Sequence, residues 1–289
     1  MAASFPIFIV GAGRSGNTLL RRVVVATEQV YIPPETYEMG EIIRTWPRLF
    51  LLPWRLRVWL FCAFFEKHRH FPTFGLPNLN EFAAQAVELP RRQRKLRYLF
   101  EAFFLHLGEK SGFHAARWGD KTPYNTMGLR EISRTFEDAR FVYIYRDGLD
   151  VASSYRRAGL YPDLASAAAR WVRANRQCHH FGERAPARMR SLRYEDMVSA
   201  PEEHLPPLFD WLSLEYSPDV LERVPAGLGD VDQLAHHAAT KDAISPRSIG
   251  RWRQDLGPQD LAGLPDAFWT QMQRLGYPGT PEAALAGSI

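Results

Sequence analysis

Short apolar runs alternate with stretches of helical periodicity along most of the chain. The runs at 5–10, 140–145 and 189–194 have the length of buried strands. The segments between them repeat apolar residues every three or four positions, which predicts helices. Strands alternating with helices indicate an α/β protein with a parallel sheet covered by helices on both faces. The predicted helices are 18–28, 81–109 with an interruption near Pro90, 149–157, 163–180, 202–212 and a terminal helix that ends near Leu275.

Residues 33–115 do not follow this alternation. Six prolines make 33–80 read as irregular, and we predict that the whole stretch is a mainly helical or irregular insertion, or a lid over a site. Residues 227–244 read as a loop, and 280–289 as a frayed, disordered tail. No linker divides the chain, so we predict one domain over 1–289.

Charge and cysteine content narrow the chemistry. The 36 basic residues, 31 Arg and 5 Lys, outnumber 32 acidic residues, for a net charge of +4. Arginine favours bidentate contacts with phosphate or sulfate. The basic excess is small and evenly spread, so it does not indicate nucleic-acid binding. Two cysteines, Cys62 and Cys178, are too few for a disulfide framework or a four-cysteine zinc site.

The segment 49–65 is the best candidate for membrane contact. Pro53, Arg55 and Arg57 lie inside it, which makes a transmembrane helix unfavourable. It could lie on a membrane surface as an amphipathic helix, or be a buried or pocket-lining helix. Because no signal-peptide or spanning pattern is visible, we expect a cytoplasmic location.

Residues 11–18, Gly-Ala-Gly-Arg-Ser-Gly-Asn-Thr, follow the first predicted strand and open the first helix. This is the setting of a phosphate-binding loop, in which glycines let backbone N–H groups approach an anion at a helix N-terminus. The spacing matches the loop of ATPases and GTPases, except that Asn17 replaces the lysine that reaches their β- and γ-phosphates. The long cation is Arg14, three residues earlier. The pattern indicates nucleotide binding without ordinary ATP chemistry.

This loop resembles the 5′-phosphosulfate loop of sulfotransferases that use 3′-phosphoadenylyl sulfate (PAPS). Its Arg-Ser-Gly-x-Thr form is similar to that of tyrosylprotein sulfotransferases and bacterial relatives. The resemblance implies a three-layer P-loop-like fold, PAPS as co-substrate, adenosine 3′,5′-bisphosphate (PAP) as product, no metal, and a small-molecule, glycan or glycolipid acceptor with a hydroxyl group. It also implies that the phosphosulfate binds to Gly13, Arg14, Ser15, Gly16, Asn17 and Thr18.

Three later motifs continue the resemblance in the same order. Arg146, at the end of the second strand, and Ser154, eight residues on, match the pair that binds the 3′-phosphate. Tyr194, in Tyr-Glu-Asp-Met, is similar to the tyrosine that approaches the adenine. Arg247 and Arg251, in Arg-Ser-Ile-Gly-Arg-Trp, resemble the loop that closes over the nucleotide, and either could reach the 3′-phosphate.

Sulfuryl transfer needs cations where negative charge develops and a base for the acceptor proton. Arg14 is one candidate cation. Lys121, in Trp-Gly-Asp-Lys-Thr-Pro, resembles the lysine that faces the leaving group in this family. The relatives with arginine in the loop use a glutamate soon after the first helix as the base, which implies Glu35. Glu38 and Glu41 are alternatives to Glu35.

Two other interpretations fit part of the sequence. A P-loop kinase or NTPase would need Mg²⁺ and an acidic ligand at a strand end, whereas the second strand ends in Tyr145-Arg146. A non-catalytic nucleotide-binding module would need neither Lys121 nor Glu35. The nine histidines show no HExxH or Cys/His zinc spacing, so no metal site is predicted.

The acceptor is expected to bind to 33–115, which carries many aromatic residues. They predict a pocket with a hydrophobic or sugar-stacking face, suited to a lipid-linked sugar, a secondary metabolite or a phenol. A peptidyl tyrosine is less favoured, because no secretory anchor is visible. The aromatic residues are Phe50, Trp54, Trp59, Phe61, Phe64, Phe65, Phe71 and Phe74.

Overall fold

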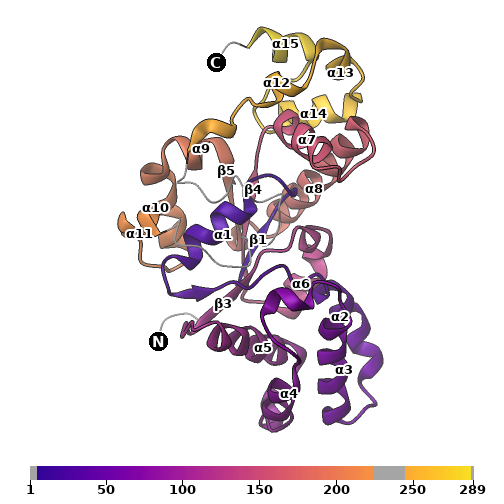
Figure 1. Ribbon diagram of the computed structural model, residues 1–289, viewed down its shortest axis with the longest axis vertical. Helices are drawn as coiled ribbons and strands as arrows, with labels where there is room; N and C mark the ends of the chain where they lie inside the picture. The colour runs from indigo at the N-terminus through magenta and orange to yellow at the C-terminus, as the bar shows by residue number, and fades with distance from the viewer. Residues whose placement is uncertain (1–4, 224–244, 288–289) are drawn as a thin grey trace.

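The computed structural model describes residues 5–223 and 245–287. Five parallel strands in the order β2-β3-β1-β4-β5 lie at its centre, with helices around them (Figure 1). This confirms the predicted α/β class. The strands are β1 (Ile7–Val10), β2 (Val30–Tyr31), β3 (Arg117–Asp120), β4 (Arg140–Tyr145) and β5 (Met189–Arg193).

The strands β2 and β3 were not predicted from the sequence. β2 has two residues, and β3 reads Arg-Trp-Gly-Asp, with a charged residue at each end, so neither contains an apolar run. Both are nevertheless buried, and Ile7 of β1 pairs with Gly119 of β3. A Cβ on Gly119 would lie 2.5 Å from the Ile7 carbonyl oxygen, so glycine permits this close pairing.

Side chains alternate along β1 and divide the core between the two faces of the sheet. Ile7 and Ile9 pack with helices on one face, whereas Phe8 belongs to a phenylalanine-rich cluster on the other. The helices therefore form two outer layers, as the predicted three-layer arrangement requires. The Ile7 face is covered by α1 (Asn17–Val25), α9 (Tyr194–Ser199), α10 (Pro201–Trp211) and α11 (Asp219–Arg223).

The expectation that 33–80 is irregular is wrong, because two helices form there: α2 (Met39–Thr45) and α3 (Trp54–Glu66). The prolines lie between or at the start of helical turns, as Pro53 does before α3, where proline does not interrupt a helix. The predicted helix at 81–109 is two helices, α4 (Asn80–Val87) and α5 (Leu96–Lys110), broken around Pro90 as expected.

Aromatic packing joins these helices to the sheet. The Phe65 ring of α3 stacks on Phe103 of α5 with ring centroids 4.3 Å apart. Phe104 stacks in turn on Trp118 of β3 at 4.3 Å, and Trp118 meets Phe8 of β1 edge to face at 5.8 Å. Residues 33–115 thus share one hydrophobic cluster with the sheet.

The remaining helices include one that was not expected. The predicted frayed tail at 280–289 is wrong for 280–287, because α15 (Pro281–Ala286) begins after Thr280, whose hydroxyl accepts from the Ala283 N–H at 3.2 Å. Residues 288–289 and the predicted loop at 227–244 lie outside the described residues. The other helices are α6 (Leu129–Thr135), α7 (Gly148–Arg157), α8 (Leu164–Arg184), α12 (Trp252–Asp255), α13 (Pro258–Ala262) and α14 (Asp266–Arg274).

Within 5–223 and 245–287, no helix is long and apolar enough to cross a membrane. The longest helix, α8, carries charged residues along its length, and α3, the most aromatic, has 13 residues. A helix of 13 residues extends for about 20 Å, less than the hydrocarbon thickness of a bilayer.

The aromatic cluster leads to a stability prediction. Phe103→Ala removes a fully buried ring that packs on Phe61, Phe65 and Phe82, so we expect the free energy of unfolding to fall by about 3–5 kcal/mol. Urea denaturation monitored by circular dichroism measures it. Phe50→Ala is the control: Phe50 is 68% exposed, and the change should be below about 0.5 kcal/mol. Equal losses for the two variants would contradict the packing described here.

Candidate active site

The turn between β1 and α1 has backbone angles and close contacts that favour glycine at two positions. Gly16 has φ +96°, and a Cβ there would lie 2.4 Å from the Tyr194 ring. A Cβ on Gly13 would lie 2.7 Å from the Tyr155 hydroxyl. Arg14 adopts a left-handed conformation with φ 66°, which is strained for a residue with a side chain. The surrounding side chains therefore fix the turn in a tight cradle before the helix N-terminus, the shape of an anion-binding loop.

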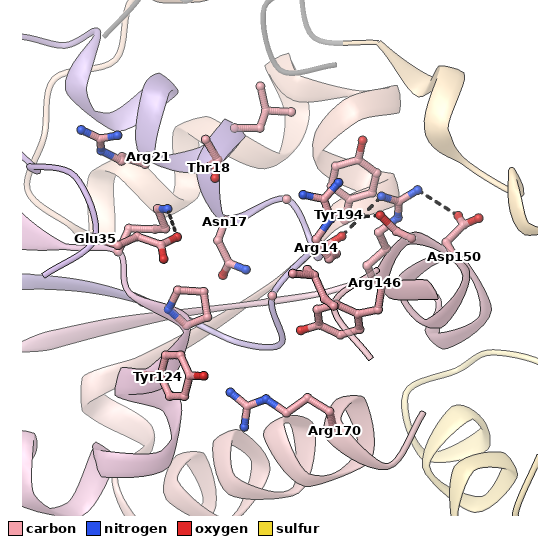
Figure 2. Close-up of a pocket in the computed structure, with 18 of the residues that line it drawn as sticks. Arg14, Asn17, Thr18, Arg21, Glu35, Tyr124, Arg146, Asp150, Arg170 and Tyr194 are labelled. Carbon is pink, nitrogen blue, oxygen red and sulfur yellow. Dashed lines mark hydrogen bonds and ion pairs between the residues drawn. The ribbon is translucent and has the colours of Figure 1, made fainter. Parts of the chain in front are cut away.

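Two predicted arginines converge beside this cradle from different strand ends (Figure 2). The Arg14 Nε donates a hydrogen bond to the Ser154 Oγ of α7 at 3.0 Å. The Arg146 Nη1 is 3.5 Å from the Arg14 carbonyl oxygen. Burial lowers the pKa of Arg14, and the nearby charges of Arg157 and Arg146 lower it further. The fold thus brings Arg14, Arg146 and Ser154 together.

Asp150 ties Arg146 to the C-terminal part of the chain. Its Oδ2 accepts from the Arg146 Nη2 at 3.1 Å and from the Gly250 N–H at 3.0 Å. Its Oδ1 accepts from the Trp252 N–H at 2.9 Å. The Arg146 Nη2 also donates to the Ser248 carbonyl oxygen. Sequence reasoning missed this carboxylate, although its place four residues after an arginine at the start of a helix could have indicated an ion pair.

Of the other predicted nucleotide contacts, some line the cavity and some do not. The Arg146 guanidinium lies 4.4 Å from the centre of the Tyr194 ring, and Tyr194 and Arg251 both line the cavity described below. Arg247 is exposed and is not part of the cavity wall, whereas Arg251 is. Ser15 is fully buried, and its side chain does not line the cavity.

Glu35 and Lys121 form an ion pair on the opposite side of Asn17 from Arg146 (Figure 2). The Lys121 Nζ lies 2.6 Å from the Glu35 Oε1, and the lysine side chain is 4% exposed. Burial raises the pKa of Tyr37, and the negative charge of Glu35 and a hydrogen bond to it raise this pKa further. The Glu35 carboxylate therefore lies close to both the Lys121 ammonium group and the Tyr37 phenol.

The two alternative glutamates occupy different positions. Glu38 lines the same cavity, is buried, and lies 3.7 Å from the His68 Nε2; burial raises its pKa. Glu41 is exposed, pairs with Lys67 at 3.6 Å, and does not reach the cavity. Of the three glutamates, Glu35 and Glu38 line the cavity and Glu41 does not.

A buried hydroxyl–carboxylate network, which sequence reasoning also missed, positions this ion pair. Asp120, at the end of β3, accepts hydrogen bonds from the Thr36 Oγ1 at 2.5 Å and the Thr122 Oγ1 at 2.7 Å. The Thr36 N–H donates to the Thr122 Oγ1 at 2.9 Å. Because Thr36 follows Glu35 and Asp120 precedes Lys121, the network joins the two segments that carry the ion pair.

One cavity of about 660 Å³ contains the loop, the arginines and the ion pair. Its far side is lined by Tyr37, whose ring stacks on His68 at 5.0 Å and His70 at 4.9 Å, and by Tyr124 and Arg170. The prediction that the aromatic residues between 50 and 74 line the acceptor pocket is wrong. None of the eight aromatic residues between 50 and 74 lines the cavity, because most of them pack into the core against α4 and α5.

Across 5–223 and 245–287, no group of three or more His, Cys, Asp or Glu side chains is arranged to hold a metal ion. His68 and His70, the histidines in the cavity wall, lie against aromatic rings instead. Arg14, Arg146, Lys121 and Glu35 can support anion binding and proton transfer.

Comparison with known proteins agrees with this geometry. Residues 6–218 match the model of the sulfotransferase family. The chain belongs to this family. A Caenorhabditis briggsae protein, named as a predicted protein-tyrosine sulfotransferase, is 24% identical over 269 residues, covering 90% of this chain and 85% of that protein. A second protein of the same name, from Caenorhabditis elegans, is 25% identical over 175 residues, covering 57% of this chain and 67% of that protein.

Two solved structures share the fold of this family member. The sulfotransferase domain of the olefin synthase from Synechococcus PCC 7002 superposes with a TM-score of 0.66 at 21% identity, covering 96% of this chain and 97% of that domain. The sulfotransferase domain of the curacin biosynthetic pathway superposes with a TM-score of 0.63 at 20% identity, covering 96% and 99%.

The loop also has the polar capacity that a phosphosulfate donor needs. Among the described residues, the Ser15 Oγ, the Asn17 Oδ1 and the Arg146 Nε are buried without a hydrogen-bond partner. Buried polar atoms of this kind usually have a partner in proteins, a ligand included. The Ser15 side chain does not line the cavity, but Arg146 does, and its Nε is a donor unpaired within the described residues beside the glycine cradle, which fits a polyanionic nucleotide.

The Asp120 network leads to a second prediction. Asp120→Ala leaves the Thr36 and Thr122 hydroxyls without their acceptor in the interior, so we expect a loss of about 2–4 kcal/mol in the free energy of unfolding. Urea denaturation measures the loss. Asp138→Ala, which breaks a half-exposed ion pair with Arg97, should cost less than about 1 kcal/mol. If both variants were equally stable, Asp120 would not organise this region.

Proposed function

We propose that this protein transfers a sulfuryl group from PAPS to a hydroxyl group of its acceptor. Membership of the sulfotransferase family gives the reaction class. The observation that carries the proposal further is the presence of two cationic sites in one cavity, on either side of the glycine cradle. Arg14 and Arg146 lie on one side and Lys121 on the other. PAPS carries two phosphate groups on its ribose and a sulfuryl group to be transferred, so it needs several cations: Arg14 and Arg146 serve the two phosphate groups and Lys121 serves the transfer.

In the proposed complex, the cradle residues 13–18 and Arg14 bind the 5′-phosphosulfate. Arg146 and Ser154 bind the 3′-phosphate, and Arg251 closes over it from the C-terminal segment. Tyr194 lies between the loop and Arg146, where it can contact the adenine. Asp150 orients the Arg146 guanidinium through the hydrogen bond at 3.1 Å.

The proposed reaction is an in-line displacement at sulfur. The acceptor oxygen forms a bond to sulfur while the bond between sulfur and the phosphate oxygen breaks, and its electron pair leaves with PAP. Glu35 takes the acceptor proton, and Lys121 donates a hydrogen bond to the leaving oxygen. Their 2.6 Å ion pair holds a carboxylate, the form that accepts a proton, beside the cation that receives the developing charge.

A phosphoryl-transfer reaction is less well supported. A kinase would need an acidic side chain at a strand end to hold Mg²⁺. Asp120 ends β3, but it is fully buried and accepts hydrogen bonds from two threonine hydroxyls. Asn17 replaces the phosphate-binding lysine and donates its Nδ2 to the Ala12 carbonyl oxygen at 2.7 Å.

A phenolic acceptor fits the far side of the cavity best. The rings of Tyr37, His68, His70 and Tyr124 line it beside Glu35, and aromatic rings favour stacked or edge-to-face partners. The Caenorhabditis relatives are named for action on protein tyrosine, a phenol, which supports the same chemical class.

The 3′-phosphate assignment can be tested by ligand binding. PAP should raise the melting temperature in the presence of EDTA, and ADP should raise it much less. Arg146→Ala should weaken PAP binding about tenfold to a hundredfold, because it removes charge-assisted hydrogen bonds. Arg247→Ala is the matched control, since Arg247 is exposed outside the cavity, and should bind PAP normally. Equal stabilisation by PAP and ADP would contradict the assignment of Arg146 and Ser154 to the 3′-phosphate.

The base can be tested by turnover. With isotopically labelled sulfate in PAPS and a panel of phenols, Glu35→Gln should lower kcat by about a hundredfold to ten-thousandfold while PAP affinity stays the same. Glu41→Gln should leave both unchanged, because Glu41 does not reach the cavity. A large loss in Glu38→Gln combined with full activity in Glu35→Gln would move the role to Glu38.

A further inference from the structure

Residues 42–65 combine exposed apolar side chains with unopposed positive charge. This stretch contains four arginines and no aspartate or glutamate. Of the eight large hydrophobic side chains that are clearly exposed among the described residues, five lie here. Exposed apolar side chains gathered in one place mark interaction surfaces. We call these residues the α3 surface: Phe50, Leu51, Leu56, Trp59 and Leu60.

The helix α3 is apolar on two faces. Its buried residues, including Trp54, Val58 and Phe61, repeat at the spacing of one helical face and pack into the phenylalanine core. Leu56, Trp59 and Leu60 repeat at intervals of three and four on the outward face. A surface helix of a water-exposed protein normally carries polar residues there. Something other than water should therefore cover the outward face of α3.

The same stretch, 42–65, carries exposed arginines. Arg44, Arg48 and Arg55 are exposed, and none of them lies within 4 Å of a carboxylate in the described part of the chain. Arg57 differs: its guanidinium is about 6 Å from the rings of Trp46 and Trp54. Three cations thus remain available to an anionic partner on the solvent side.

We propose that the α3 surface binds an anionic lipid bilayer. The 13-residue helix would lie in the plane of the interface, because it is too short to cross. Leu56, Trp59 and Leu60 would enter the acyl boundary, and the three exposed arginines would meet phosphate head groups. A second copy of the chain is a poorer partner, because a symmetric contact through this surface brings like charges together.

The helix α3 lies at the opposite end of the molecule from the C-terminal helices α12 to α15 (Figure 1). Lipid binding at this helix does not depend on the proposed reaction, because it is measured without donor or acceptor. It does bear on the cavity, since α3 ends at Glu66, two residues before His68 in the cavity wall.

Sedimentation with lipid vesicles tests the proposal. The full chain should bind vesicles of phosphatidylcholine mixed with phosphatidylglycerol, bind phosphatidylcholine alone much more weakly, and lose affinity as salt is added. The pair Arg48→Gln and Arg55→Gln should weaken binding about thirtyfold. The pair Trp59→Ser and Leu60→Ser should weaken it about tenfold or more.

Matched controls come from helices outside residues 42–65. Arg173→Gln with Arg274→Gln removes two exposed charges, and Leu285→Ser removes an exposed apolar side chain on α15; both should bind vesicles normally. All variants should keep the circular dichroism spectrum of the parent. The proposal is overturned if vesicle binding is absent, equal for both lipid mixtures or unchanged in the α3 variants. It is also overturned if the chain is a dimer that Trp59→Ser with Leu60→Ser dissociates.

Discussion

The parallel pairing of β1 with both β3 and β4 is the constraint on which the rest of the site depends. Phe8 pairs with Asp120 on one side, and Val10 pairs with Tyr143 on the other. The carboxyl ends of the three strands therefore meet at one edge of the sheet, which is where open α/β sheets bind their ligands. Lys121, the glycine loop and Arg146 follow these three ends, so the parallel neighbours β3, β1 and β4 bring them to one cavity.

Gathering cations in a partly buried cavity is unfavourable unless something offsets their repulsion. The lowered pKa of Arg14, caused first by burial and then by the neighbouring arginines, records this cost. Asp150 offsets part of it at Arg146, and Glu35 offsets part of it at Lys121. The Arg146 Nε nevertheless stays buried without a partner among the described residues. A cavity so arranged favours a polyanionic ligand over the unliganded state.

The parts of the site that could be predicted are those formed by residues close together in the sequence. The glycine loop and Arg146 each directly follow a strongly apolar strand, and Ser154 lies in the helix after Arg146, so their local order fixes where they lie. The Asp120 network could not be predicted in this way, because it joins residues 84 and 86 positions apart through a strand that lacks an apolar pattern. The prediction that the aromatic residues of 50–74 line the acceptor pocket was wrong for a related reason. Composition shows that they are apolar, but only packing decides whether they line a cavity, fill the core or face outward, as Phe65 and Trp59 show.

The exchange of the loop lysine for Asn17 explains the remaining asymmetry of the cavity. The Asn17 Nδ2 donates to the Ala12 carbonyl oxygen, so this side chain braces the loop from within. The cation of the loop approaches instead from the Ser154 side, through Arg14. The opposite side is then left to Lys121 and Glu35, which belong to other segments. Under the proposed reaction, this division separates the residues that bind the donor from those that act on the transferred group, and it lets the acceptor reach Glu35 without displacing the loop cation.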